Sequence, residues 1–420
     1  MGWSEMLPPS RFLTLPSFAR QSERSVTAPQ GFAAAGAATG VKKRGKLDLG
    51  ILVSQEPCVS AVTFTQNAAA AAPVRLTRET GECGALRAVV VNAGNANACT
   101  GKQGLADAAR MRLLTAQQLR LPVEVVAVAS TGVIGVPLPM ERIEPGITAT
   151  ARAVRPGGGE HFAQAIRTTD RTPKRGALEI ETPEGVVRLG VAAKGCGMIS
   201  PNMATMLCFV TCDAQVASDV WTVMVKDAVD ASFNRVTVDG QESTNDMVLA
   251  LANGAAGVAP GDEGLTRVAE GLRAALLSLA LAMVADGEGA TKTVKLTVSG
   301  ARDADEAEHV ARAVADSPLV KTAFYGRDAN WGRIVQSAGQ VLGGPGAVAP
   351  TLDVAYDGLA VVCGGQPAAL GEGAQERLAD IMTLPEIELA MDLRSGEGAA
   401  TVYFSDLTHD YVSLNAEYST

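Results

Sequence analysis

The segment 194–207 holds the residues of the chain with the clearest chemical potential. It brings glycines, Lys194 and a proline close to an Ala204–Thr205 junction. If that peptide bond breaks, Thr205 gains a free α-amino group beside its own hydroxyl. An α-amino group titrates near ~8 and can therefore take the hydroxyl proton close to neutral pH. The segment predicts self-cleavage between Ala204 and Thr205, with Thr205 supplying both nucleophile and base.

Nucleophilic catalysis that depends on histidine has little support in the sequence. The three histidines, His161, His309 and His409, stand among polar residues, and no G-x-S-x-G turn presents a serine. A nucleophile in this chain would need another base. This favours Thr205, which carries its own amine.

Two further stretches could contribute to a site. Ser130, Thr131 and Gly132 follow an apolar strand pattern, and such a turn can aim an N–H group and a hydroxyl at an oxyanion. A plain turn from strand to loop is the more frequent meaning of this pattern. Glu288 stands between two glycines, where its carboxylate could approach a ligand amine closely, although an ordinary loop at a helix end is again more frequent.

Two polar blocks allow a structural and a functional interpretation. The asparagine-rich stretch 92–97 fits a polar loop near a pocket and, equally, a turn satisfied by its own amides. The block 325–333 could bind a carboxylate through arginine, although a structural network of arginine and aspartate is favoured.

Composition narrows the class of protein. A chain of 420 residues predicts two or three compact units, and 47% hydrophobic with 19% charged residues indicates a globular chain. The net charge of −9 argues against a nucleic-acid partner. No apolar run reaches the ~18 residues of a membrane span, so a membrane partner is not expected. Seven scattered cysteines predict neither a disulfide framework nor a metal site.

Hydrophobic periodicity predicts an α/β fold with helices layered on sheets. Strands are expected over 47–53, 87–91 and 123–129, a helix over 105–120 and a hairpin over 178–189. After the junction, strands are expected over 207–211, 294–298, 386–393 and 399–404, with helices over 218–232, 265–285 and 304–315. Ser218 is the expected cap of its helix. Residues 1–25 are expected to be an extension or a transit-type presequence, because 1–24 hold three arginines and only two acids.

Taken together, these segments resemble the glutamate N-acetyltransferase family of arginine biosynthesis, also called ornithine acetyltransferases. The resemblance rests on Lys194-Gly-x-Gly-Met-Ile-x-Pro-Asn-Met-Ala-Thr205-Met-Leu and covers nearly everything from Thr27 onward. Supporting stretches lie at 89–101, 130–135, 168–170, 243–246, 286–292, 326–333 and 415–420. Cys196, Cys208, Cys212, Ala329 and the pair Gln241-Glu242 depart from the usual family pattern.

The resemblance implies an ornithine acetyltransferase/DmpA-like fold with sheets sandwiched between helices. It implies an α chain over 26–204 and a β chain over 205–420 that stay together, usually as an α2β2 heterotetramer. Acetyl would pass from N2-acetyl-ornithine to glutamate through acetyl-Thr205, with ping-pong kinetics. No cofactor is implied. Some relatives also use acetyl-CoA, so acetyl-CoA is a second candidate donor.

Site residues follow from the same resemblance. Thr205 is the nucleophile, and Thr131 with Gly132 matches the oxyanion-hole pair. Substrate-binding positions match Lys194, Glu288, Asn415, Thr420 and one threonine of the pair Thr168 and Thr169, of which Thr168 is favoured. A self-processing aminopeptidase of related fold is the alternative, since it would let water take the acyl group. Sequence similarity to plant-type members favours a plastid over a mitochondrial or bacterial location.

Overall fold

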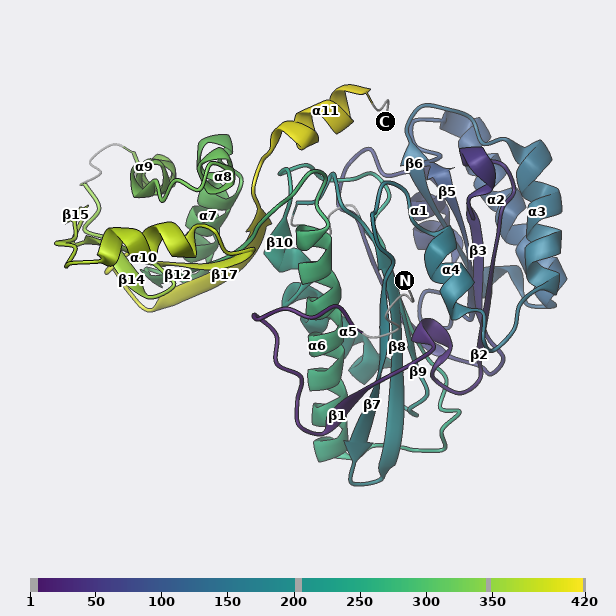
Figure 1. Cartoon of the computed structure of the whole chain (residues 1–420). Coiled ribbons are helices and arrows are strands. Elements are labelled where there is room, and N and C mark those ends of the chain that lie inside the picture. Colours follow the sequence, from purple (N-terminus) through teal and green to yellow (C-terminus); the bar gives the residue numbers. More distant parts are fainter. Residues whose placement is uncertain (1–6, 201–205, 345–348, 418–420) are drawn as a thin grey trace. The chain divides into compact units, whose positions relative to one another are not determined.

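Two compact units make up the chain, and each is described by itself. The computed structural model describes residues 7–200, 206–344 and 349–417 (Figure 1). Within these residues the first unit holds 7–234, apart from the gap at 201–205, together with 241–283. The second unit holds 235–240 and the described residues from 284 to 417.

A four-stranded sheet in the first unit carries part of the predicted site. Its order is β2 (Phe32–Ala37), β3 (Leu49–Ser54), β5 (Ala88–Asn95) and β6 (Val126–Val133). Strands β5 and β6 run parallel, joined through helix α2 (Gly101–Leu119) and the short turn η3 (Val123–Val125). Parallel strands end at the same edge of a sheet, so the polar residues that follow β5 and β6 meet there.

A six-stranded sheet forms the second layer of this unit. Its order is β1 (Ala19–Ser22), β7 (Lys174–Thr182), β8 (Gly185–Lys194), β9 (Leu207–Cys212), β11 (Met247–Ala252) and β4 (Val59–Phe64). Strands β8 and β9 pair antiparallel, from Lys194 opposite Leu207 to Leu189 opposite Cys212. The predicted hairpin is present, because Thr182 of β7 pairs with Gly185 of β8.

The two sheets enclose one core, and helices cover their outer faces. Leu52 and Val89 of the four-stranded sheet share this core with Phe209 and Leu249 of the six-stranded sheet. Phe162 lies edge-on to Phe209, with ring centroids 5.1 Å apart. The helices of the unit besides α2 are α1 (Ala72–Thr80), α3 (Met140–Arg152), α4 (Gly159–Ala165), α5 (Ser218–Asp230) and most of α6 (Asp262–Ala285); the short turns are η1 (Ser25–Thr27), η2 (Lys43–Gly45) and the start of η4 (Phe233–Arg235).

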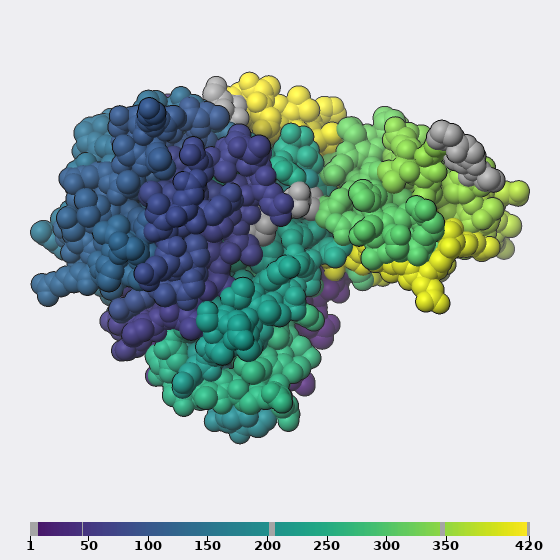
Figure 2. All heavy atoms as spheres, turned by 180° about the vertical axis from the view of Figure 1, so that it is seen from behind, coloured from purple at the N-terminus to yellow at the C-terminus, as the bar shows by residue number. Residues whose placement is uncertain are grey.

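Alternation along the strands explains this layering. Leu49 and Ile51 of β3 pack with Ile147 of α3 and Met111 of α2 on the outer side, whereas Leu52 points to the inter-sheet core. Every residue of β3 is buried, as expected for a strand covered on both faces. On the far side of the six-stranded sheet, α5 packs through Trp221, whose Nε1 donates to the Ala250 carbonyl at 3.1 Å. In the space-filling view most of the purple and blue N-terminal residues lie together, and a few purple atoms also appear beyond the teal ones (Figure 2).

A seven-stranded sheet organises the second unit. Its order is β10 (Val236–Thr237), β17 (Gly398–Ser405), β12 (Thr293–Ala301), β16 (Glu386–Asp392), β13 (Asp353–Tyr356), β14 (Leu359–Cys363) and β15 (Gln366–Pro367). Its helices are α7 (Ala304–Ala315), α8 (Pro318–Tyr325), α9 (Trp331–Leu342), α10 (Ala374–Ile381) and α11 (His409–Glu417). Leu389 of β16 packs with Val310 of α7 and Phe324 of α8, while Glu388 and Ala390 on the opposite face are exposed.

Helix α6 is long and apolar enough, by length and composition alone, to cross a membrane. Its most apolar window is 67% buried, however, and Gly271 lets the helix approach Ile180 of the six-stranded sheet. Core helices of globular proteins meet the same two criteria, and α6 is packed as one.

The α/β fold predicted from the sequence is confirmed, and one detail, the cap of a helix, differs from expectation. Ala217, not Ser218, is the cap residue of α5, and no side chain caps that helix end. Part of the N-terminal segment belongs to the fold, because β1 pairs with β7 and Leu7 is buried. The first compact unit includes residues on both sides of the 204/205 junction, since β9 belongs to a sheet that also holds strands from before that junction.

Candidate active site

Strand β6 ends in a backbone conformation that only glycine accommodates. Gly132 has φ +135°, and a Cβ atom there would lie 2.3 Å from the carbonyl carbon of Gly94 on β5. The pairing of β5 with β6 shifts register between Gly94 and Asn95. Gly132 therefore sits directly against the β5 backbone, and Thr131 precedes it as a nearly buried residue.

Side-chain amides hold this strand end in place. Ser130 Oγ donates to Asn92 Oδ1 at 2.6 Å, and Asn92 Nδ2 donates to the Asn95 carbonyl at 2.8 Å. From the other sheet, Asn245 Nδ2 donates to the carbonyls of Ser130 and Ala96 at 2.9 and 2.7 Å. The asparagine-rich stretch thus serves the structural role that was one of its two interpretations, and it braces the predicted oxyanion strand.

Lys194 is brought to Thr131 from the other sheet. It is the last residue of β8, is 4% exposed, and its Nζ donates to Thr131 Oγ1 at 3.2 Å. Two predicted site residues far apart in the sequence therefore touch. Because the ammonium occupies a lone pair of the hydroxyl, the Thr131 O–H remains available to donate elsewhere.

A buried carboxylate that the sequence analysis did not single out organises the loop beside Lys194. Asp170 Oδ1 accepts from Lys174 Nζ at 2.8 Å and from the Gly195 amide at 2.7 Å, and Oδ2 accepts from the Thr168 amide at 3.1 Å. Burial alone would raise the pKa of Asp170. The attraction of Lys174 and Lys194, with the Gly195 hydrogen bond, instead holds the pKa below its ordinary value.

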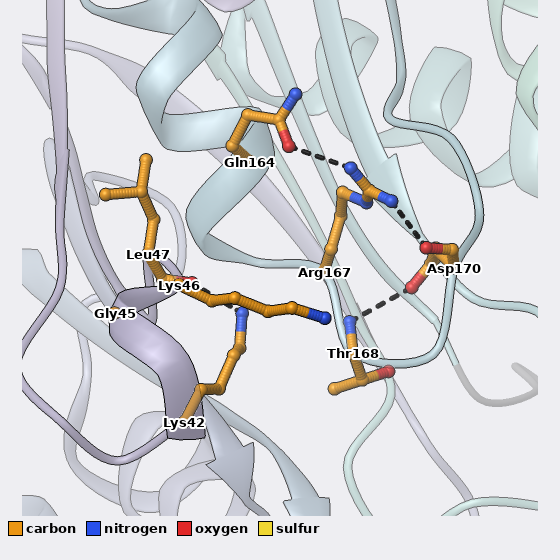
Figure 3. Close-up of a pocket in the computed structure, with 8 residues that line it drawn as sticks. All are labelled: Lys42, Gly45, Lys46, Leu47, Gln164, Arg167, Thr168 and Asp170. Carbon is orange, nitrogen blue, oxygen red and sulfur yellow. Dashed lines mark hydrogen bonds between the residues drawn. The ribbon is translucent and has the colours of Figure 1, made fainter.

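The two predicted threonines of this loop differ in their surroundings. Thr168 lines a cavity of about 430 Å³ together with Lys42, Lys46, Arg167 and other residues (Figure 3). Thr169 is exposed and shares a hydrogen bond with the Cys196 Sγ at 3.0 Å. Burial raises the pKa of the Cys196 thiol to about 12, so this cysteine is neutral in the physiological range. The cavity gives Thr168 the setting of a binding residue.

A second buried carboxylate, also missed, contacts the first described residue after the junction. Asp246 Oδ1 accepts from the Met206 amide at 2.7 Å. Burial raises the pKa of Asp246 well above its ordinary value, against the hydrogen bond from Met206 and the attraction of Lys194. Burial thus favours the protonated form of this carboxyl. Asp246 belongs to the segment 243–246 that carries part of the family resemblance, which was the available signal.

In the second unit, two of the predicted binding residues, Glu288 and Asn415, contact each other. Asn415 Nδ2 donates to Glu288 Oε2 at 2.9 Å. Gly289 has φ +71°, and a Cβ atom there would lie 2.5 Å from the Tyr411 nitrogen, so the loop requires glycine. The predicted residues Ala204, Thr205 and Thr420 lie outside the described residues.

The fold and the first unit's site together define a class of protein. A layered α/β chain presents a glycine backbone and a threonine hydroxyl, with a buried lysine behind the hydroxyl, at the end of a strand. Such a constellation is suited to stabilising the oxyanion of a tetrahedral intermediate, as acyl transfer requires.

Comparison with known proteins gives the family. The ArgJ family model matches residues 33–420. The arginine biosynthesis bifunctional protein ArgJ of Symbiobacterium thermophilum is 48% identical over 402 residues, which is 94% of this chain and 98% of that protein. The protein of the same name from Geobacter sulfurreducens is 46% identical over 397 residues, 93% of this chain and 99% of that one. A crystal structure of ornithine acetyltransferase from Mycobacterium tuberculosis, complexed with ornithine, has 39% identity and a TM-score of 0.41, covering 44% of this chain and 98% of that chain. This chain belongs to the ArgJ family.

Proposed function

We propose that the chain is an ornithine acetyltransferase of arginine biosynthesis, which moves acetyl from N2-acetyl-ornithine to glutamate. Full-length similarity to bifunctional ArgJ proteins supports the assignment. The observation that carries it is the contact of Lys194 with Thr131 beside Gly132, with Lys194 paired opposite Leu207, two residues after Thr205 in the sequence. A transferase also fits these relatives better than the aminopeptidase alternative does.

The proposed reaction has two steps: acetyl is first transferred to Thr205 and then from Thr205 to glutamate. The Thr205 amine takes the hydroxyl proton while Oγ1 attacks the acetyl carbonyl, and the oxyanion accepts from the Gly132 amide and the Thr131 hydroxyl. The C–N bond of acetyl-ornithine then breaks, ornithine leaves with the proton, and acetyl stays on Thr205. The amine of glutamate attacks this ester, which releases N-acetylglutamate and restores the hydroxyl. Removing one oxyanion donor costs about 10²–10³-fold in such reactions.

Charge assigns roles to the substrate-binding residues. The Lys194 ammonium suits a carboxylate and lies at the oxyanion strand, where both amino acids must bring their α-carbons. The Glu288 carboxylate is oriented by the Asn415 amide and suits the ammonium of ornithine. Thr168 and the C-terminal Thr420 complete the proposed set.

The proposed processing leaves an α chain over 26–204 and a β chain over 205–420. Six residue pairs join β8 and β9 across the proposed break, from Lys194 opposite Leu207 to Leu189 opposite Cys212. A sheet that includes strands of both chains keeps them together after the bond is cut. Association of two such pairs would give the α2β2 assembly.

The test combines processing with turnover. Purified protein should give two bands on a denaturing gel. N-terminal sequencing of the C-terminal fragment should give Thr205 as its first residue. Thr205→Ala should leave one full-length band and no acetyl transfer, while Thr222→Ala, at an exposed position on α5, should be processed and active. A processed and active Thr205→Ala protein would overturn the mechanism.

Turnover separates the candidate activities. Ornithine should appear from acetyl-ornithine only when glutamate is present, and equal release without glutamate would identify a hydrolase. Replacing acetyl-ornithine by acetyl-CoA then determines whether this chain is bifunctional like its relatives.

A further inference from the structure

The cavity that Thr168 lines is strongly cationic. Lys42, Lys46 and Arg167 line it from two separate segments, and its volume is about 430 Å³ (Figure 3). Asp170 is the one carboxylate among its described lining residues. That carboxylate is already engaged by Lys174 and by two backbone amides. The cavity therefore holds positive charge that its own lining does not neutralise.

Lys42 and Arg167 are held by carbonyl or amide oxygens, and neither forms an ion pair with a described residue. Lys42 Nζ donates to the Leu47 and Ala165 carbonyls at 2.6 and 3.0 Å, which leaves one N–H unused. Arg167 donates to Gln164 Oε1 at 2.8 Å and to two backbone carbonyls. Lys46 extends across the cavity in the direction of Thr168 (Figure 3).

Asp48, a carboxylate that accepts from the Lys42 amide, is also engaged. It accepts from the amides of Thr39, Gly40 and Lys42 and from the Thr39 hydroxyl, at 2.7 to 3.0 Å. These bonds fold the loop that carries Lys42 and Lys46. The backbone of this loop is thus held by Asp48 while neither lysine ammonium forms an ion pair with that carboxylate, as expected for a site that takes an anion from outside.

Backbone contacts place this cavity next to the oxyanion strand. A Cβ atom on Gly94 would lie 3.1 Å from Lys42 Cγ, so the Lys42 stem packs on one side of that glycine. Gly132 packs directly against the Gly94 backbone, at 2.3 Å from a Cβ placed on Gly132. The Lys42 stem and the proposed oxyanion donor therefore contact the same short piece of β5.

We propose that Lys42, Lys46 and Arg167 bind an anionic group of a substrate, a carboxylate or a phosphate, while its reacting end lies at Thr131 and Gly132. This inference rests on the proposed function. Glutamate differs from acetyl-ornithine by a second carboxylate, and acetyl-CoA carries phosphates. Acetyl-ornithine brings an ammonium in place of either group, which three cations would repel. The cavity would thus distinguish one substrate of the reaction from another.

Charge removal at Lys46 tests the proposal with little risk to folding, because this side chain is exposed and forms no hydrogen bond with a described residue. Lys43→Gln is the matched control, since Lys43 lies on the same turn, is exposed and does not line the cavity. Kinetics at low ionic strength should compare acetyl-ornithine, glutamate and acetyl-CoA. Lys46→Gln should raise KM by about 5- to 10-fold for one anionic substrate and leave acetyl-ornithine unchanged. Lys46→Arg should restore the wild-type value.

The substrate affected identifies the anion. A change with glutamate alone assigns the cavity to the side-chain carboxylate, and a change with acetyl-CoA alone assigns it to a phosphate. Unchanged kinetics with every substrate, or an equal change with acetyl-ornithine, would overturn the proposal.

A binding measurement separates this inference from the proposed function. Reductive methylation of the wild-type protein, read by mass spectrometry, should be slowed by glutamate or by inorganic phosphate at Lys46 and not at Lys43. If the wild type transfers no acetyl but Lys46 is protected, the proposed function fails and the anion site stands. If acetyl is transferred and neither anion protects Lys46, the anion site fails alone.

Discussion

Replacing Lys174 by methionine should destabilise the first unit strongly. The Lys174–Asp170 pair is 2.8 Å long, and its side chains are 1% and 0% exposed. Methionine fills a similar volume but leaves the Asp170 carboxylate buried without its closest counter-ion. Removing one partner of a buried pair typically costs about 3–5 kcal/mol. The two amide hydrogen bonds and Lys194 remain, so the lower half of that range is expected.

The sign of the pH dependence follows from the depressed pKa of Asp170. In the wild type this carboxylate contributes stability above its unfolded-state pKa of ~3.9, and the contribution is lost as pH falls through the lower folded-state pKa. Without Lys174 the pKa of Asp170 rises, so the variant can protonate this group in mild acid. The difference in stability between wild type and variant should therefore be full at neutral pH and shrink as pH falls below about 5.

Native-state hydrogen exchange of the β7 and β8 amides measures the local free energy of unfolding in this unit. Lys174→Met should lower it by about 3 kcal/mol at neutral pH. Lys226→Met, at an exposed position on α5, should leave it unchanged. A loss under about 1 kcal/mol, or a difference that grows in acid, would refute the electrostatic account of this pair.

Three further predictions concern the site. Gly132→Ala should lower acetyl transfer at least ~100-fold in steady-state assays with the protein still folded by circular dichroism, because its Cβ meets the Gly94 backbone. Asp246→Ala should slow self-cleavage on a gel time course by removing the acceptor of the Met206 amide, whereas Asp246→Asn, which keeps an oxygen acceptor at this position, should process nearly normally. Burial lowers the pKa of Lys42 to about 8, so glutamate affinity should weaken above this pH, and Lys42→Arg should remove that dependence.

Local patterns predicted much of the fold. The helix expected over 304–315 is α7, Ala304–Ala315, because its apolar period and flanking residues are local signals. Strands β5 and β9 were found within a few residues for the same reason. Strand β1 was missed, since an amphipathic four-residue segment becomes a strand only by pairing with β7, far along the chain.

The site residues, like the strands and helices, were predicted only where a local sequence motif carries the signal. Motif similarity located Thr131, Gly132 and Lys194, but nothing in their spacing shows that Lys194 touches Thr131. Asp170 and Asp246 look like ordinary surface carboxylates in the sequence. Their function appears only when the chain buries them against a lysine or a backbone amide, which depends on contacts between distant segments.

One continuous set of contacts links the two ends of the proposed substrate site. Lys194 contacts Thr131, the next residue Gly195 donates to Asp170, and the same carboxylate accepts from Thr168 at the cavity. Asp170 therefore positions the oxyanion side and the anion side together. Its loss should impair every substrate to a similar degree, whereas the loss of Lys46 should impair only the substrate whose anion enters the cavity. That contrast distinguishes a residue that positions the site from residues that select what it binds.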